Sequence, residues 1–227
     1  MRRWLIVVAY LLSMSISASA QEEPEYRMEV GGALGVVSYE GDFNGNITKN
    51  AQPLVALVAK YRMNPRMSLG GSLTTGKLKG SSKDVDSYFP ELHDSVYSFS
   101  NQLIDLGLRY EYNFWAYGTG REYRGARPLT PFIALGLGAI YHGGAEKGLA
   151  VNLPFGAGVK YKLGNRLNLT AEWRMHFSMS DKLDGVEDPY GIKSTGIFKN
   201  TDCFSILQVA LTYDFWAKCK TCHNDRD

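Results

Sequence analysis

Residues 104–114 read IDLGLRYEYNF, and apolar and polar side chains alternate through the whole stretch. Because successive residues of a β-strand point to opposite faces, this stretch predicts a strand with one apolar and one polar face. A strand that crosses a bilayer at a tilt needs roughly nine to eleven residues, whereas the strands of soluble proteins average about five or six. The stretch is therefore typical of a membrane-crossing strand.

The same alternation recurs along the chain and predicts an all-β fold, an eight-stranded antiparallel transmembrane β-barrel. The other strands are expected at about 26–38, 53–63, 67–76, 133–142, 151–162, 169–177 and 207–215. Pro65 and Gly164 favour tight turns after two strands, and residues 115–127 form a basic connection on the same side. The polar segments 39–52, 77–97 and 180–201 predict longer loops on the opposite side. Short turns on one side and long loops on the other are typical of transmembrane barrels.

Three parts of the chain differ in composition. Residues 1–20 begin with Arg2 and Arg3, continue with an apolar run and end in Ala-Ser-Ala, which predicts a secretory signal peptide. Residues 21–216 hold the strands and predict an outer-membrane β-barrel, and residues 217–227 predict a polar tail in the periplasm. The chain has 25 basic and 23 acidic residues, a balance that does not favour nucleic acid as a partner.

Charged residues lie on the polar face of most strands. If that face is inside, the expected barrel-interior charge network consists of Arg27, Glu29, Lys60, Arg62, Asp105, Arg109, Glu111, Lys160, Glu172 and Arg174. Eight strands enclose a space that side chains can fill, and buried charges need partners, so the barrel is expected to be a plug and not a pore. A soluble sandwich or lipocalin-like barrel would instead leave these charges in water.

Aromatic residues gather at the short-turn ends of the expected strands. They are Tyr26, Tyr61, Tyr110, Tyr112, Phe114, Trp115, Tyr161, Tyr213, Phe215 and Trp216. Such residues form a girdle where a barrel meets the lipid headgroups. This girdle, the strand length and the signal peptide favour the bacterial outer membrane, with lipid around the barrel, over a soluble fold.

The tail contains Cys219, Cys222 and His223 in a CxxCH pattern. Haem attachment would need a following domain, and zinc would need a ligand from a partner, because zinc takes about four. In an oxidising periplasm a disulfide, within the tail or to another protein, is expected. Cys203 is expected near the outer face, roughly 40 Å along the strand from Cys219, too far for a bond between them.

Five segments resemble the PorG-like family of outer-membrane barrels of the type IX secretion system, namely residues 26–32, 60–66, 130–138, 154–161 and 172–174. The segment 180–184 is also similar to the family. The resemblance implies an outer-membrane component of a protein-export machine that docks the periplasmic ring of PorK-like and PorN-like subunits. It implies no catalytic residue and no cofactor.

The candidate contacts with a periplasmic partner follow from sidedness. They are Asn64, Pro65, Arg66, Tyr123, Arg124, Asn165, Arg166, Cys219, Cys222 and His223. Two alternatives remain open. An outer-membrane lipid-modifying enzyme could use His142 and His176 near the outer strand ends, with Ser178, Ser180 and Asp181 nearby. A surface-binding, adhesin-like barrel would act through the outer loops 80–97 and 180–201.

Overall fold

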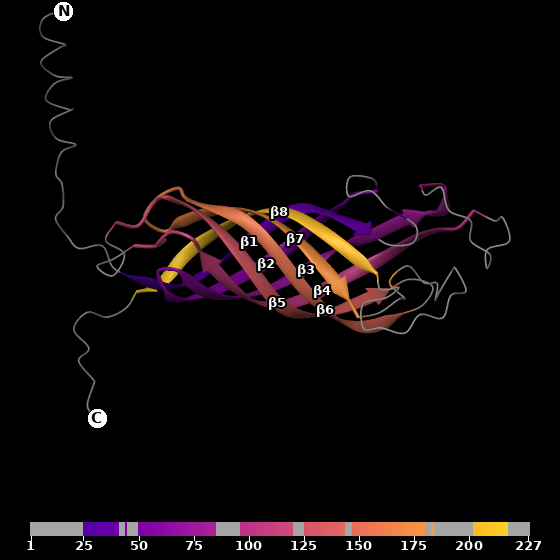
Figure 1. Ribbon diagram of the computed structural model, residues 1–227, viewed down its shortest axis with the longest axis horizontal. Coiled ribbons are helices and arrows are strands. Elements are labelled where there is room, and N and C mark those ends of the chain that lie inside the picture. The colour runs from indigo at the N-terminus through magenta and orange to yellow at the C-terminus, as the bar shows by residue number, and fades with distance from the viewer. Residues whose placement is uncertain are drawn as a thin grey trace, which may run out of the picture.

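The computed structural model describes residues 25–40, 44, 50–84, 96–119, 125–143, 147–179, 183 and 202–217. Eight strands follow one another, β1 Tyr26–Glu40, β2 Gln52–Asn64, β3 Met67–Ser81, β4 Ser98–Asn113, β5 Leu129–Gly143, β6 Gly148–Lys162, β7 Leu167–Ser178 and β8 Cys203–Ala217, with a short 3-10 helix η1 at Ser82–Asp84. Each strand pairs antiparallel with its neighbour, and β1 pairs with β8 (Figure 1). The predicted eight-stranded barrel is confirmed.

Apolar side chains cover the outside of this barrel. Leu34, Leu57 and Leu149 are exposed on the outer wall, whereas Arg109 and Glu111 are buried inside. Removing apolar surface from water stabilises a protein by about 25 cal/mol per Å², so an apolar surface of this size would be costly to leave in water. The exterior therefore faces lipid, as the alternation predicts.

The two ends of the barrel differ. Tyr26 pairs with Ala217, so the start of β1 and the end of β8 meet at one end, together with the tight β2–β3 and β6–β7 turns and the longer β4–β5 connection (Figure 1). In outer-membrane barrels the short turns face the periplasm and the long loops face outward. We therefore name these the periplasmic and extracellular ends. No helix among the described residues is long and apolar enough to cross a membrane.

Strand β3 is longer than the sequence predicts. Residues 77–81 were expected in a loop, but Lys77 pairs with Gln102 and Ser81 pairs with Ser98. The alternation continues here, with Leu78 buried and the lysines on either side exposed. The prediction was wrong because the outward residues become polar where the strand leaves the hydrocarbon layer.

The aromatic girdle is mostly as expected. Tyr61, Tyr110, Tyr161 and Tyr213 are exposed on the outer wall near the periplasmic end. Tyr26 is the exception, because it is buried and its hydroxyl accepts a hydrogen bond from Arg166 Nε at 2.8 Å. The expected signal peptide, residues 1–20, and residues 218–227 of the expected tail lie outside the described residues, and Ala217 belongs to β8.

The closing seam between β1 and β8 depends on glycine. A Cβ atom at Gly31 would lie 2.0 Å from the carbonyl oxygen of Leu211, and one at Gly35 would lie 2.2 Å from that of Leu207. Both contacts involve the backbone of the partner strand, which cannot move without breaking the ladder. Gly32 points outward, and its Cβ would approach nothing closer than Ala56 O at 3.8 Å.

We predict that Gly31→Val weakens the barrel and that Gly32→Val does not. Overpacking at Gly31 should cost about 1–3 kcal/mol of unfolding free energy or more, because the seam must open to admit the side chain. The outward substitution should change it by less than about 0.5 kcal/mol. Urea unfolding of both variants in detergent measures the difference, and equal losses would contradict the close approach at the seam.

Candidate functional site: the filled barrel interior and its two ends

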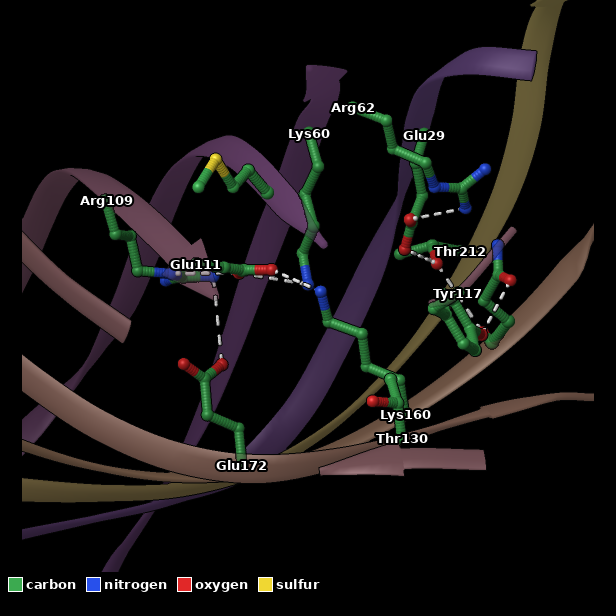
Figure 2. A network of polar contacts seen from close by, with 12 residues as sticks. Glu29, Lys60, Arg62, Arg109, Glu111, Tyr117, Thr130, Lys160, Glu172 and Thr212 are labelled. Atoms are coloured by element: carbon green, nitrogen blue, oxygen red, sulfur yellow. Dashed lines mark hydrogen bonds and ion pairs between the residues drawn. The ribbon is translucent and has the colours of Figure 1, made fainter. Parts of the chain in front are cut away.

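Glu111 on β4 is the centre of the ionic network inside the barrel. Its carboxylate accepts from Lys160 Nζ at 2.6 Å and pairs with Lys60 Nζ at 3.1 Å and Arg109 Nε at 3.5 Å. Lys60, Glu111 and Lys160 come from β2, β4 and β6, so side chains from alternate strands meet across the lumen (Figure 2). The ring of Phe132 lies 4.7 Å from Lys160 Nζ, which adds a cation–π contact.

A second carboxylate, Glu172 on β7, extends this network. Its oxygens lie 3.7 Å from Arg109 Nη2 and 3.7 Å from Arg174 Nε. Gln208 on β8 donates to Glu172 at 3.2 Å and accepts from Arg174 Nη2 at 3.0 Å. Arg109 is thereby shared between the two carboxylates (Figure 2). The middle of the lumen is filled by paired charges.

Arg62 on β2 is the centre of a third group, near the periplasmic end. Its Nη2 atom pairs with Glu29 at 3.0 Å and with Asp214 at 2.6 Å. Asp214 also pairs with Lys162 Nζ at 2.9 Å, and Glu29 accepts from the hydroxyl of Thr212. This group joins β1, β2, β6 and β8 around the lower lumen.

Tyr117, in the β4–β5 connection, covers the periplasmic mouth. It is buried, and its hydroxyl donates to Asn168 Oδ1 at 2.8 Å. Its ring lies 5.8 Å from the guanidinium of Arg62 and 5.6 Å from Lys162 Nζ. Burial raises the pKa of Tyr117, so the phenol remains a neutral donor. Tyr117 therefore closes the mouth from a connection that the sequence marks only as basic.

The extracellular part of the lumen is apolar, which the sequence analysis missed. A buried cluster fills it, made of Val37, Tyr39, Leu54, Leu78, Phe99, Leu103, Ile140, Leu183, Phe204 and Ile206. Leu183 comes from the β7–β8 loop; its N–H donates to Asp202 at 2.9 Å, and its carbonyl accepts from Asn101 at 2.7 Å. The signal was present, since the inward positions of these strands change from charged to apolar toward the long loops.

Nine of the ten charged residues predicted in the interior are buried there. Arg27 is the exception, because its side chain is 35% exposed, pairs with Glu25 at 3.5 Å and donates to Tyr61 OH at 3.3 Å. The β1–β2 ladder begins only at Met28, so Arg27 lies at the rim and not in the lumen. Asp214 and Lys162 were missing from the predicted set, although the same alternation turns both inward.

The predicted periplasmic contacts have different environments. Asn64 Oδ1 caps its own turn by accepting from the N–H groups of Arg66 at 2.9 Å and Met67 at 2.8 Å. Arg166 lies 4.6 Å from the ring of Tyr26 and donates to Tyr213 OH at 2.8 Å, so it fixes the β6–β7 turn to the seam. The remaining predicted contacts are Pro65, Arg66 and Asn165, which lie at the turns, and Tyr123, Arg124, Cys219, Cys222 and His223, which lie outside the described residues.

The histidines considered for catalysis lie inside the barrel. His142, His176 and Ser178 are buried, and His176 is stacked on Phe204 at 4.4 Å. The described residues contain no group of three or more His, Cys, Asp or Glu side chains that could hold a metal ion. Ser180 and Asp181 lie outside the described residues, as do most of the outer loops considered for an adhesin-like surface.

The outer wall is apolar, and the lumen is filled by paired charges and by the buried apolar cluster. These features define a closed β-barrel of the bacterial outer membrane. Residues 2–224 match a family model described as a domain of unknown function, DUF6089. The chain belongs to that family. No curated protein matches the sequence.

Solved structures share the barrel fold at low sequence identity. The chain is 13% identical to Neisserial surface protein A over 83% of this chain and 97% of that chain, with a TM-score of 0.53. Ail of Yersinia pestis, in complex with a heparin analogue, is 12% identical over 85% of this chain and 99% of that chain, with a TM-score of 0.45. The outer membrane protein OprG from Pseudomonas aeruginosa is 12% identical over 87% of this chain and 99% of that chain, with a TM-score of 0.46.

We predict that Arg62→Gln destabilises the barrel far more than Arg27→Gln. Removing Arg62 breaks the shortest ion pairs of Glu29 and Asp214 in the lumen, which should cost about 3–5 kcal/mol of unfolding free energy. The rim pair of Arg27 should contribute less than about 1 kcal/mol. Urea unfolding in detergent compares the two, and a similar loss for both would place Arg27 in the network after all.

We also predict that the protein conducts no ions in a planar lipid bilayer. Tyr117→Ala should remain closed as well, because the network around Glu111 still fills the middle of the lumen. Stepwise current from the folded wild-type protein would contradict the plug.

Proposed function

We propose that this protein is a non-enzymatic outer-membrane anchor of the type IX protein secretion system, which docks a periplasmic ring of PorK-like and PorN-like subunits. The type IX secretion system is named here because five segments of the sequence resemble PorG-like barrels. A filled lumen supports it, because such a barrel offers its ends and outer wall for function instead of a pore. The buried positions of His142 and His176 give no support to an enzyme that acts on membrane lipid.

The observation that carries the proposal is the rigid construction of the periplasmic end. Backbone hydrogen bonds join its connections, from Tyr117 N to Pro65 O at 2.9 Å, from Arg127 N to Ala116 O at 3.1 Å and from Lys162 N to Pro128 O at 2.7 Å. We call the surface formed by residues 64–66, 114–119, 125–128 and 163–166 the periplasmic rim. A pre-ordered surface binds with a smaller entropy cost than loose turns would.

The periplasmic rim presents a small set of exposed polar groups. Arg66 and Asn165 are exposed at the tips of the two tight turns, and neither side chain has a hydrogen bond or ion pair within the described part of the chain. Arg127 is exposed, and its guanidinium lies 4.6 Å from the ring of Trp115. Two guanidinium groups on a rigid surface favour a partner that presents carboxylates.

We predict that Arg66→Glu reduces recovery of the periplasmic partner. The tagged full-length protein is purified from the outer membrane, and co-purifying chains are identified and quantified by mass spectrometry. Wild type should recover ring subunits, and reversal of the charge should lower their yield roughly fivefold or more.

Lys147→Glu is the matched control, since Lys147 is exposed at the extracellular end. This variant should recover the subunits as wild type does. Absence of ring subunits from the wild-type preparation would contradict the secretion role. An equal loss in both variants would contradict docking through the periplasmic rim.

A further inference from the structure

A groove of about 800 Å³ lies on the outer wall at the extracellular end of β2 and β3. Its apolar side is lined by Leu34, Pro53 and Val55, all exposed on the lipid-facing surface. Lys77, Lys79 and Gln102 line its polar side, and none of the described residues that line it is acidic. The groove therefore combines a surface for hydrocarbon with two cations on the outside of a membrane barrel.

The groove follows from unequal strand lengths. The pairing of β3 with β2 ends at Thr75 opposite Val55, whereas its pairing with β4 continues to Ser81 opposite Ser98. Beyond Thr75 the edge of β3 is no longer covered by β2, and the wall is hollowed beside it. Residues 77–81 of β3, which the sequence predicts to lie in a loop, therefore carry both lysines of the groove.

The height of the lysines places them at the outer leaflet. Leu69 faces outward on β3 between Tyr61 and Tyr110 of the periplasmic aromatic girdle. From Leu69 to Lys77 the strand climbs about 20 Å along the membrane normal, given a rise of about 3.3 Å per residue and a tilt of about 40°. The apolar band of such barrels is about 25 Å tall, so Lys77 lies about 5 Å below its upper edge, and Lys79, about 25 Å above Leu69, lies at that edge.

Both ammonium groups are available to a ligand. Lys77 and Lys79 are exposed and have no hydrogen bond or ion pair with any described residue. They lie two residues apart on one face, so their Cα atoms are about 7 Å apart. Phosphate is the group that lysine recognises best at a lipid headgroup, and basic pockets on membrane proteins bind phosphorylated headgroups.

We propose that this groove is a binding site for the phosphorylated glycolipid of the outer leaflet, of the lipid A class. Lys77 and Lys79 hold headgroup phosphate, Gln102 faces the sugar, and an acyl chain lies against Leu34 and Val55. The site is independent of the periplasmic rim and of any secretion partner. It fixes one side of the barrel to the outer leaflet.

The test uses the full-length protein in detergent, stripped of lipid, with bisphosphorylated lipid A as the probe. Binding is measured by native mass spectrometry for wild type and for the Lys77→Gln/Lys79→Gln variant. The Lys83→Gln/Lys147→Gln variant is the matched control, since it removes two exposed lysines outside the groove. Loss of the groove lysines should weaken binding about tenfold or more, because each cation near a lipid headgroup contributes about fivefold. The control should bind as wild type does.

Two further lipids separate the sources of affinity. Dephosphorylated lipid A should bind wild type about tenfold more weakly, since it lacks the group that the lysines recognise. Phosphatidylglycerol should also bind more weakly, since it has no sugar for Gln102. Equal affinity for all three lipids, or an equal loss in both double variants, would overturn the proposal. If the groove variant does not fold, the comparison of lipids on the wild-type protein decides.

Discussion

The narrow interior of an eight-stranded cylinder is the constraint on which the rest of this structure depends. Side chains from opposite walls touch there, so a charge that points inward has no water to solvate it and must find its counterion among the other inward residues. Glu111 meets this requirement for Lys60 and Lys160, and Glu29 and Asp214 meet it for Arg62. In the apolar layer above, the buried carboxylate of Asp202 accepts hydrogen bonds from the Tyr39 hydroxyl and from the N–H of Leu183.

The alternation of residues was sufficient to predict the fold, because it has the same period as the strand and most polar faces carry charges. It placed Arg109 and Glu172 inside correctly. It failed for Arg27, since a residue at the end of a strand has neighbours on one side only and can turn to solvent. It also missed Tyr117 and Leu183, because both lie in connections, and nothing in the spacing of a loop shows that its side chain returns into the lumen.

The ion-pair partner of each charged residue could not be predicted from the sequence either. Periodicity tells which face a residue occupies, but partners such as Arg62 and Asp214 lie far apart in the chain and meet only after the barrel has closed. The same holds at the surface, where Arg166 proved to be part of the seam. Arg66 is exposed at the tip of its turn, where its backbone N–H donates to Asn64 Oδ1 at 2.9 Å.

The joining of alternate strands at Glu111 has a consequence for how the chain enters the membrane. A hairpin that moved alone into hydrocarbon would take Lys60 or Glu111 with it, and an isolated charge at that depth is expensive. The counterions are on separate hairpins, since β2, β4 and β6 supply one side chain each. Insertion must therefore be concerted, with the sheet curled around its ionic centre before its strands pass through the lipid.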